Sequence, residues 1–437
     1  MYFIYNILAV ILVIVALPVF AIRTFQEKGF TERLKQSLGW LPAATICKLA
    51  GKDVIWLHAA SVGEIVAASP IVKEIRHELP GIPVLVSVVT ASGYEMAQRI
   101  IPEADGVIFS PLDLPWLSRS VITRIRPRVF LLVETELWPN FLKAARELNI
   151  PVMMVNGRIS EKSLARYSYL KGVLKEMLDT IVKFCMQSTI DAQYITRLGA
   201  DPDRIVVTGN TKFDQSYTKL NADEKALLHQ DLRLRSPGTV IVAGSTHKGE
   251  EDLLLAAFTR VVAEFPDTQL IIAPRDIMRA GEIAELAGKY NFTAARRTKL
   301  AGGTSGDFMH VIIIDTIGEL GKIYGVADIV FIGGSLIAHG GHNLLEPAAH
   351  GKPILTGPHM FNFKDTYALL SGRDACETVR DSDSLAAAVL NLLRNPAAAR
   401  QMGDEALAII KENQGAARKS AVHLREVLQA NDLLQTN

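Results

Sequence analysis

Short, continuous apolar runs that alternate with amphipathic stretches constrain the fold of this 437-residue chain more than any other feature. Such runs are typical of strands buried on both faces, and helical connections between them produce a parallel sheet with right-handed crossovers. Two series of runs occur. The first comprises VIWLH (54–58), VLVSVV (84–89), VFLLV (129–133), VMMV (152–155) and IVV (205–207); the second comprises VIVA (240–243), LIIA (270–273), VIII (311–314), IVFIGG (329–334) and PILTG (353–357).

A weak internal repeat relates the two series. The stretches 54–80 and 240–266 both run from a strand through a polar, glycine-containing loop and an amphipathic helix to a proline. We therefore expect an α/β protein with two Rossmann-like βα domains facing each other across a cleft, where such sheets bind ligands. The expected boundaries are an N-terminal helix at 1–22, a first domain at 23–213, a linker at 214–236, a second domain at 237–412 and a C-terminal helix at 413–437.

The composition excludes several classes of protein. With 47 Lys and Arg against 46 Asp and Glu, the charge is too balanced for a protein that coats nucleic acid, and we predict no nucleic-acid partner. Hydrophobic residues make up 49% of the chain, which excludes a disordered protein. The three cysteines lack CxxC spacing, which argues against a disulfide framework and a zinc cluster, and the scattered histidines show no metal-ligand spacing. We therefore predict no metal site.

The uncharged segment 2–22 predicts a membrane anchor. Its length of roughly 31 Å as a helix matches a bilayer core of about 30 Å. Basic residues follow the segment, so the positive-inside rule places the remaining chain in the cytoplasm; they are Arg23, Lys28, Arg33 and Lys35. A cleaved signal peptide ending near Ala21 is one alternative, although no basic residue precedes the apolar run. A buried helix of a soluble protein is another.

The motif HAASVGE (58–64) holds the first candidate catalytic residue. Glu64 follows a predicted strand at the start of a helix, where a general base can reach a substrate hydroxyl. The alternative is structural, because Ser61-x-x-Glu64 is also the pattern of a helix capping box. A second such pattern, Ser92-x-x-Glu95, is interpreted as a cap; its functional alternative is a loop whose backbone N–H groups meet a phosphate or hydroxyl of the acceptor.

Two further candidates follow strands of the first domain. Glu134 continues the strand that precedes ETELWPN (134–140), whereas Glu136 is interpreted as a solvated loop charge. Lys212 in TGNTKFD (208–214) has the charge to neutralise a phosphate or carboxylate, and a salt bridge to Asp214 is its structural alternative.

The second domain shows features of a nucleotide site. Gly244, Ser245 and Thr246 precede a helix and form a candidate phosphate loop, although the Walker A pattern is absent. Arg275 in IIAPRD (271–276) comes just after a strand. Glu319 in DTIGELGKIYG (315–325) lies where a helix begins, and a favourable charge in the first helical turn is its structural alternative.

The glycine-rich run 331–353 is the strongest of these features. Its two Gly-Gly pairs let a backbone approach a ligand closely. A helix N-terminus near Asn343 offers N–H groups to a phosphate, and Glu346 offers an acceptor for ribose hydroxyls. A capped αβ connection, with Asn343 as N-cap and Glu346 as its capping-box partner, is the structural alternative.

Six motifs in matching order resemble the 3-deoxy-D-manno-octulosonic acid (Kdo) transferase family of Gram-negative bacteria. They are HAASVGE (58–64), ETELWPN (134–140), NTKFD (210–214), STHKGEE (245–251), APR (273–275) and GGSLIAHGGHNLLEPAAHGKPILTGPHMFNFKD (333–365). The resemblance covers nearly the whole chain. It implies a GT-B glycosyltransferase with a single-pass anchor at the cytoplasmic face of the inner membrane. The implied reaction moves Kdo from CMP-Kdo to the lipid A precursor (lipid IVA) in lipopolysaccharide biosynthesis.

The resemblance also implies how the site works. The family inverts the anomeric centre and needs neither a metal nor another cofactor. It implies that Glu64 is the general base and that Glu134 and Lys212 stabilise the transition state. The CMP contacts that it implies are Pro274, Arg275, Gly318, Glu319, Leu320, Asn343, Leu344, Leu345 and Glu346.

Two other functions remain open from the residues. One is a sugar-nucleotide 2-epimerase of GT-B fold, which has no need of the anchor. The other is a catalytically silent, membrane-tethered nucleotide-sugar binder, against which the presence of Glu64 and Lys212 argues.

Overall fold

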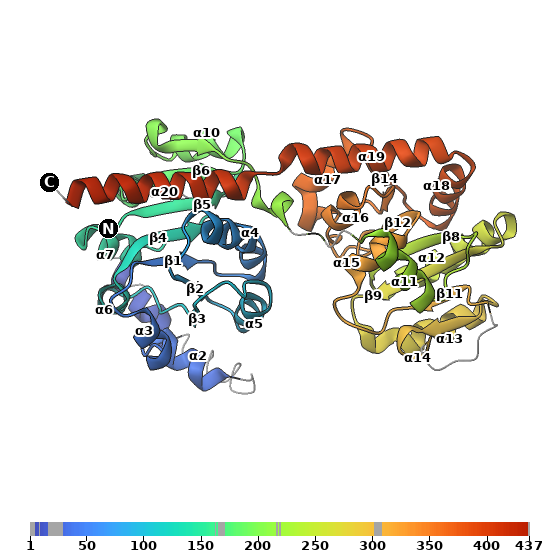
Figure 1. Cartoon of the computed structure of the whole chain (residues 1–437), viewed down its shortest axis with the longest axis horizontal. Helices are drawn as coiled ribbons and strands as arrows, with labels where there is room; N and C mark the ends of the chain where they lie inside the picture. Colours follow the sequence, from blue (N-terminus) through green and yellow to red (C-terminus); the bar gives the residue numbers. More distant parts are fainter. Residues whose placement is uncertain are drawn as a thin grey trace. The chain divides into compact units, whose positions relative to one another are not determined.

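The computed structural model describes residues 5–7, 9–15, 29–161, 163–164, 171–215, 217, 220–300 and 308–435. The chain forms two compact units, Met1–Gln215 with Asn413–Asn437, and Ser216–Glu412. The segment 214–236, expected as a linker, contains helix α11 (Ala222–Asp231), and from Ser216 onward it belongs to the second unit. Helix α20 (Ala416–Gln435) returns to the first unit (Figure 1).

The first unit is built on a seven-stranded parallel sheet with the order β3-β2-β1-β4-β5-β6-β7. The strands are β1 (Val54–His58), β2 (Val84–Val88), β3 (Gly106–Phe109), β4 (Pro127–Val133), β5 (Val152–Gly157), β6 (Ile181–Met186) and β7 (Ile205–Val207). The helices are α2 (Phe30–Ser37), α3 (Ala43–Leu49), α4 (Val62–Glu78), α5 (Ala91–Ile100), α6 (Pro115–Ile125), α7 (Pro139–Glu147), α9 (Lys171–Asp179) and α10 (Thr189–Arg197), with the 3-10 turns η2 (Pro202–Arg204) and η3 (Thr211–Asp214).

Helices cover both faces of this sheet, which explains why its strands are continuously apolar. Along β1, Val54 and Trp56 pack with α3, α6, α7 and α9, whereas Ile55 and Leu57 pack with α4, α5 and α20. All four side chains are fully buried. Each fully buried large apolar side chain contributes about 1.5–3 kcal/mol, so the two cores fix the sheet between its helix layers.

The second unit repeats this architecture with a seven-stranded parallel sheet of order β10-β11-β9-β8-β12-β13-β14. The strands are β8 (Thr239–Thr246), β9 (Thr268–Pro274), β10 (Ala294–Arg296), β11 (Val311–Ile313), β12 (Ile329–Ile332), β13 (Ile354–Thr356) and β14 (Glu377–Thr378). The helices besides α11 are α12 (Glu250–Glu264), α13 (Ala280–Lys289), α14 (Arg297–Leu300), α15 (Leu320–Ile323), α16 (Leu345–Ala349), α17 (Lys364–Ser371), α18 (Ser382–Arg394) and α19 (Pro396–Asn413), with the 3-10 turns η4 (Ile277–Arg279), η5 (Tyr324–Val326) and η6 (Phe361–Phe363).

Both sheets therefore confirm the predicted pair of Rossmann-like βα units. Each sheet also has a switch in strand order beside its first strand. β1 pairs with β2 on one side and β4 on the other, and β8 pairs with β9 and β12. Ligands of parallel sheets bind where the connections diverge at the carboxyl ends of such strands. A ligand site is therefore expected in the loops that follow β1, β4, β8, β9 and β12.

The predicted membrane anchor lies partly outside the described residues, which omit 2–4, 8 and 16–22. Residues 5–7 and 9–15 are helical. The Tyr5 hydroxyl donates a hydrogen bond to Asp113 at 2.9 Å, and Asn140 donates one to Asn6 at 2.9 Å. Among the described residues, none of the helices combines the length and apolarity needed to cross a bilayer.

Candidate functional site

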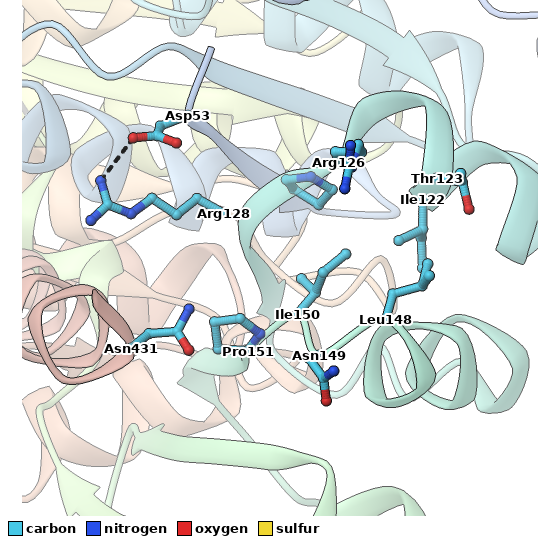
Figure 2. Close-up of a pocket in the computed structure, with 11 residues that line it drawn as sticks. Asp53, Ile122, Thr123, Arg126, Arg128, Leu148, Asn149, Ile150, Pro151 and Asn431 are labelled. Atoms are coloured by element: carbon cyan, nitrogen blue, oxygen red, sulfur yellow. Dashed lines mark hydrogen bonds and ion pairs between the residues drawn. The ribbon is translucent and has the colours of Figure 1, made fainter. Parts of the chain in front are cut away.

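A cavity of about 670 Å³ lies where β4 and β5 begin, and Figure 2 shows it. Arg128 points across it to Asp53, with 3.0 Å between guanidinium nitrogen and carboxylate oxygen, and Asn431 enters from α20. The cavity is at the amino ends of the strands, opposite to the edge where parallel sheets bind their ligands. The candidate site is therefore at the carboxyl ends.

Glu64 lies in the first turn of α4, directly after β1. Its carboxylate folds back on the helix start: Oε2 accepts the Ala60 N–H at 2.6 Å and Oε1 accepts the Ser61 hydroxyl at 2.9 Å. The Ser61 hydroxyl oxygen in turn accepts the Glu64 N–H at 3.4 Å. The predicted cap therefore forms, but the backbone N–H that Glu64 accepts is that of Ala60 rather than of Ser61.

The surroundings of Glu64 favour its protonated form. Burial is the main cause, the nearby carboxylates of Glu136 and Glu134 add to it, and the bonds from Ala60 and Ser61 oppose it; together they raise the pKa of Glu64 to about 7. A base with a pKa near the working pH takes up and releases a proton with little cost in either direction. The cap and the catalytic interpretation of Glu64 are thus compatible.

The second capping pattern differs from the prediction. Helix α5 is capped by Thr90, whose hydroxyl oxygen accepts the Gly93 N–H at 3.0 Å, and not by Ser92. Glu95 is exposed on the helix surface. The helix begins two residues earlier than the pattern indicates, because the threonine at the strand end is already extended and able to cap.

Glu136 is not the solvated loop charge that the sequence indicates. The indole N–H of Trp138 donates to Glu136 Oε2 at 2.8 Å, and His58 Nε2 lies 3.8 Å from the same oxygen. His58 is 2% exposed, and its Nδ1 is 2.9 Å from the Ser87 hydroxyl. Sequence reasoning missed both His58 and Glu136, since only the pairing of β1 with β2 and β4 brings these residues together.

Glu134 and Lys212 form an ion pair across the carboxyl end of the sheet. Lys212 Nζ lies 3.6 Å from Glu134 Oε1. Glu134 has a left-handed backbone with φ of 58°, an uncommon conformation for a residue other than glycine. Asp214 instead accepts the N–H groups of Gly415 and Ala417 at 2.5 and 2.7 Å, so the alternative of a Lys212–Asp214 salt bridge is wrong.

The turn η3 holds Lys212 against the helix that carries Glu64. The Thr211 hydroxyl donates to the carbonyl oxygen of Ala67 in α4 at 2.7 Å. The Thr211 N–H donates to the buried side chain of Asn156, at the end of β5, at 3.0 Å. The three candidate catalytic residues predicted from sequence therefore gather at one edge of one sheet.

In the second unit, the predicted phosphate loop is partly internal. The Thr246 hydroxyl is buried and donates to Glu251 at 3.0 Å, and Glu251 in turn accepts from Arg279 at 2.8 Å. A Cβ at Gly244 would collide with Tyr324. The Thr246 hydroxyl therefore has an internal partner, and Ser245, with φ of 57°, is the half-buried member of the three; whether the loop binds a phosphate stays a prediction.

Glu250, the first residue of α12, organises the glycine-rich loop after β12. Its fully buried carboxylate accepts the N–H groups of Gly334, Ser335 and Leu336 at 2.6, 2.9 and 2.9 Å, and that of His247 at 3.1 Å. Burial raises the pKa of this carboxyl, and the four N–H bonds oppose the rise.

We expect Glu250→Ala to unfold this loop locally. Each buried N–H left without an acceptor costs roughly 1–3 kcal/mol, and three of them lie on consecutive residues. Amide hydrogen exchange at residues 334–336 should accelerate by at least about a hundredfold, whereas Glu285→Ala, at an exposed position of α13, should leave it unchanged. Unaltered protection in Glu250→Ala would show that the loop holds its shape without the carboxylate.

The residues with predicted CMP contacts lie at the ends of strands β9, β11 and β12 or in the segments that follow them. The Arg275 N–H donates to the Thr246 carbonyl at 2.9 Å and its side chain is exposed, just after Pro274 at the end of β9. Gly318 has φ of 91°, and Glu319 precedes α15 and lies 3.4 Å from Arg297. Leu320 begins that helix.

Asn343 and Glu346 are joined side chain to side chain. The Asn343 amide N–H donates to Glu346 Oε1 at 3.2 Å, and its oxygen accepts the Leu345 N–H at 3.0 Å. The residue at the helix boundary is Leu344, which is buried, and α16 spans only Leu345–Ala349. The capping box of the structural alternative is therefore not formed, since Glu346 bonds the Asn343 side chain rather than its backbone N–H.

Three histidines that are scattered in sequence come together above this loop. The His247 ring stacks on those of His339 and His342, with centroids 4.1 and 5.1 Å apart. Within the described residues, no group of three or more His, Cys, Asp or Glu side chains is arranged to hold a metal ion. The spacing of these residues in sequence gave no sign of the cluster, which depends on the pairing of β8 with β12.

The two parallel sheets place the chain in the GT-B-like class, which includes glycosyltransferases and sugar-nucleotide epimerases. A crystal structure of UDP-GlcNAc 2-epimerase from Neisseria meningitidis aligns with a TM-score of 0.59 over 86% of this chain and 99% of that chain. At 14% identity this likeness shows the fold alone.

Sequence comparison identifies the family. The family model described as 3-deoxy-D-manno-octulosonic-acid transferase (kdotransferase) matches residues 32–215. The 3-deoxy-D-manno-octulosonic acid transferase of Haemophilus influenzae is 32% identical over 92% of this chain and 93% of that protein. The enzyme of the same name from Bordetella pertussis is 32% identical over 86% of this chain and 87% of that protein. The chain belongs to the Kdo transferase family and is a glycosyltransferase.

Proposed function

We propose that this enzyme transfers Kdo from CMP-Kdo to the lipid A precursor lipid IVA, with inversion at the anomeric carbon and with Glu64 as general base. The observation that carries the proposal is the environment of Glu64. This carboxylate lies at the carboxyl end of the central strand β1, beside Glu134 and Glu136, with a pKa raised to about 7.

The proposed step is a single displacement. Glu64 takes the proton of an acceptor hydroxyl as that oxygen attacks the anomeric carbon of Kdo, and the bond from this carbon to the CMP phosphate breaks. CMP leaves as an anion, and the proton on Glu64 passes to solvent. Attack from the face opposite to the leaving group inverts the configuration, as in inverting glycosidases with water in place of the hydroxyl.

Charges around the site support a transition state with oxocarbenium character. The Glu134 carboxylate would face the positive charge that develops on the sugar, and Lys212 holds that carboxylate in place at 3.6 Å. Arg275 carries an exposed cation beside the proposed CMP site. Such fixed charges lower a barrier because they need no reorganisation during the reaction, and here we propose that they replace a metal ion.

We propose that the second unit binds the CMP part of the donor. The half-buried Glu346, fixed by Asn343, would accept hydrogen bonds from ribose hydroxyls. The remaining contacts proposed by family resemblance are Pro274, Arg275, Gly318, Glu319, Leu320, Leu344 and Leu345, and Ser245 would offer its N–H or hydroxyl to the phosphate.

An apolar pocket of the first unit supports the proposal that the acceptor is a lipid. It has a volume of about 230 Å³, and Leu12, Val13, Leu112 and Trp138 are among its lining residues. Trp138 is the residue that donates to Glu136, so the pocket adjoins the carboxylate cluster. We propose that it receives part of an acyl chain of the acceptor.

We also propose that the segment 2–22 attaches the enzyme to the cytoplasmic face of the inner membrane. Within its described part, the side chains of Ile11, Leu12, Ile14 and Val15 are 51–66% exposed. Apolar side chains exposed side by side along one helix favour contact with lipid. Lys35, an exposed residue of α2, follows this segment in sequence, and its positive charge would attract anionic lipid headgroups.

A transfer assay tests the proposal. Wild-type enzyme in detergent, with freshly generated CMP-Kdo, lipid IVA and excess EDTA, should give an acceptor heavier by one or more Kdo residues and an equivalent amount of CMP. CMP binding without product would favour the silent binder. Loss of the reaction in EDTA, with recovery on adding a divalent cation, would overturn the metal-free mechanism.

The pH dependence of kcat follows from Glu64. Below its pKa of about 7 the carboxyl is protonated and accepts no further proton, so kcat should fall by about tenfold per pH unit on the acid side and level off above pH 7–8. Steady-state rates at saturating substrate from pH 5 to 8.5 measure this. A flat profile between pH 5 and 7 would mean that Glu64 does not carry the proton.

A further inference from the structure

The three-histidine cluster of the second unit has no part in the function proposed so far. His247 follows β8, whereas His339 and His342 lie in the loop between β12 and α16. The Nε2 atoms of His247 and His342 are 2.8 Å apart, within hydrogen-bond distance. This short contact, and not the stacking alone, makes the pair unusual, because it constrains how many protons the two rings carry.

A hydrogen bond between two Nε2 atoms requires one proton between them. One ring therefore carries a proton on Nε2 and donates, while the other accepts through its lone pair and carries its proton on Nδ1. Each ring then carries one proton, so both imidazoles are neutral. Burial, the neighbouring His247 and Arg275 all lower the pKa of His342, to about 4, and burial and His339 lower that of His247, so the neutral pair is the resting form.

Charged groups surround the pair from several elements. Besides His339, they are Glu250 and Glu251 of α12, Arg275 after β9 and Arg279 of η4. Glu250 and Glu251 are already engaged, by backbone N–H groups and by Arg279. The exposed Arg275 side chain is close enough to lower the pKa of both His247 and His342, so its positive charge lies near the two rings.

The backbone below the rings leaves room for this arrangement. Gly334 has φ of 67°, and a Cβ there would lie 3.2 Å from His342 and 3.3 Å from His247. Its N–H is one of those that Glu250 fixes, at 2.6 Å. The Glu250 carboxylate thus fixes both the backbone of His247 and the glycine turn under His342. The position of the two rings is therefore set by the fold of the loop.

We propose that the His247–His342 pair binds the phosphate of the CMP moiety and takes up one proton as it does so. This inference rests on the proposed donor. An arriving anion favours the charged form of an imidazole. The added proton goes to Nδ1 of the ring that donates through Nε2, so the bond between the rings persists and becomes charge-assisted. The new N–H and Arg275 then face the phosphate together.

Calorimetric titration with CMP tests the proposal. At pH 7.5 the CMP phosphate is almost fully dianionic, given a second pKa of about 6. Titrations in buffers with different ionisation enthalpies give the number of protons taken up per CMP bound. We expect about one proton for the wild type and none for cytidine, which lacks the phosphate. Affinity for CMP should also increase as the pH is lowered from 8 toward 6.5.

Matched variants locate the proton. His342→Gln should bind CMP about tenfold or more weakly and take up no proton, whereas His310→Gln, at the amino end of β11, should behave as the wild type. CMP bound by the wild type without proton uptake, or uptake retained in His342→Gln, would overturn this inference alone. Absence of CMP binding by the wild type would overturn the donor assignment as well.

Discussion

We expect Glu64→Gln to lower kcat for Kdo transfer by about 10²–10⁴-fold, the range typical of a lost general base, while CMP binds as before. A glutamine amide accepts no proton at neutral pH. Its carbonyl oxygen can still accept the Ala60 N–H, so the start of α4 keeps its cap. The substitution therefore separates the chemical role of Glu64 from its structural one.

Rates at saturating CMP-Kdo and lipid IVA measure this effect, and a CMP titration checks that the second unit is intact. The matched control is Glu95→Gln, a glutamate that lies in the first half of α5 and is exposed. It should retain wild-type kcat. Activity in Glu64→Gln equal to that of this control would reduce Glu64 to a capping residue.

Lys212→Met should have the second largest effect, a loss of about 10²–10³-fold in kcat. Lys212 lies 3.6 Å from Glu134, whose Oε1 is buried and makes no hydrogen bond among the described residues. Without the cation, this carboxylate loses its compensating charge and its position relative to the sugar. The exposed Lys175, paired with Asp179 in α9, provides the matched control Lys175→Met.

A double variant distinguishes catalysis from stability. Glu134→Gln removes the uncompensated charge, so Glu134→Gln/Lys212→Met should recover part of any Tm lost in Lys212→Met, because a partly buried charge no longer lacks its partner. It should not recover kcat. If activity returned together with Tm, the pair would serve the fold and not the reaction.

The sequence predicted most of the fold because the decisive signals are local. Ten apolar runs mark strands that helices cover, and a strand buried on both faces is apolar at every position, so each run indicates its own burial. Strand β6 was missed for the opposite reason. It carries Lys183 and the 39% exposed Val182, which interrupt the run. The strands β3, β10 and β14 were also missed, because each has positions that are not buried and none forms a continuous apolar run.

The sequence predicted a site residue only where the position of that residue after a strand was enough to indicate its role. Glu64, Glu134 and Lys212 each follow a strand, and the carboxyl ends of parallel strands meet at one edge. Glu136 and the histidine cluster depend instead on contacts between residues far apart in sequence, such as His58 with Glu136 and His247 with His342. No local pattern carries that information.

The anomeric configuration of Kdo in the product tests the central claim most directly, because the proposed single displacement, with Glu64 as the base, inverts the anomeric centre. Nuclear magnetic resonance of the isolated product, compared with the donor, measures it. We predict that Kdo is linked to the acceptor with the configuration opposite to that in CMP-Kdo. Retention would require two displacements or front-face attack, and would contradict the assignment of Glu64 as the base of a one-step transfer.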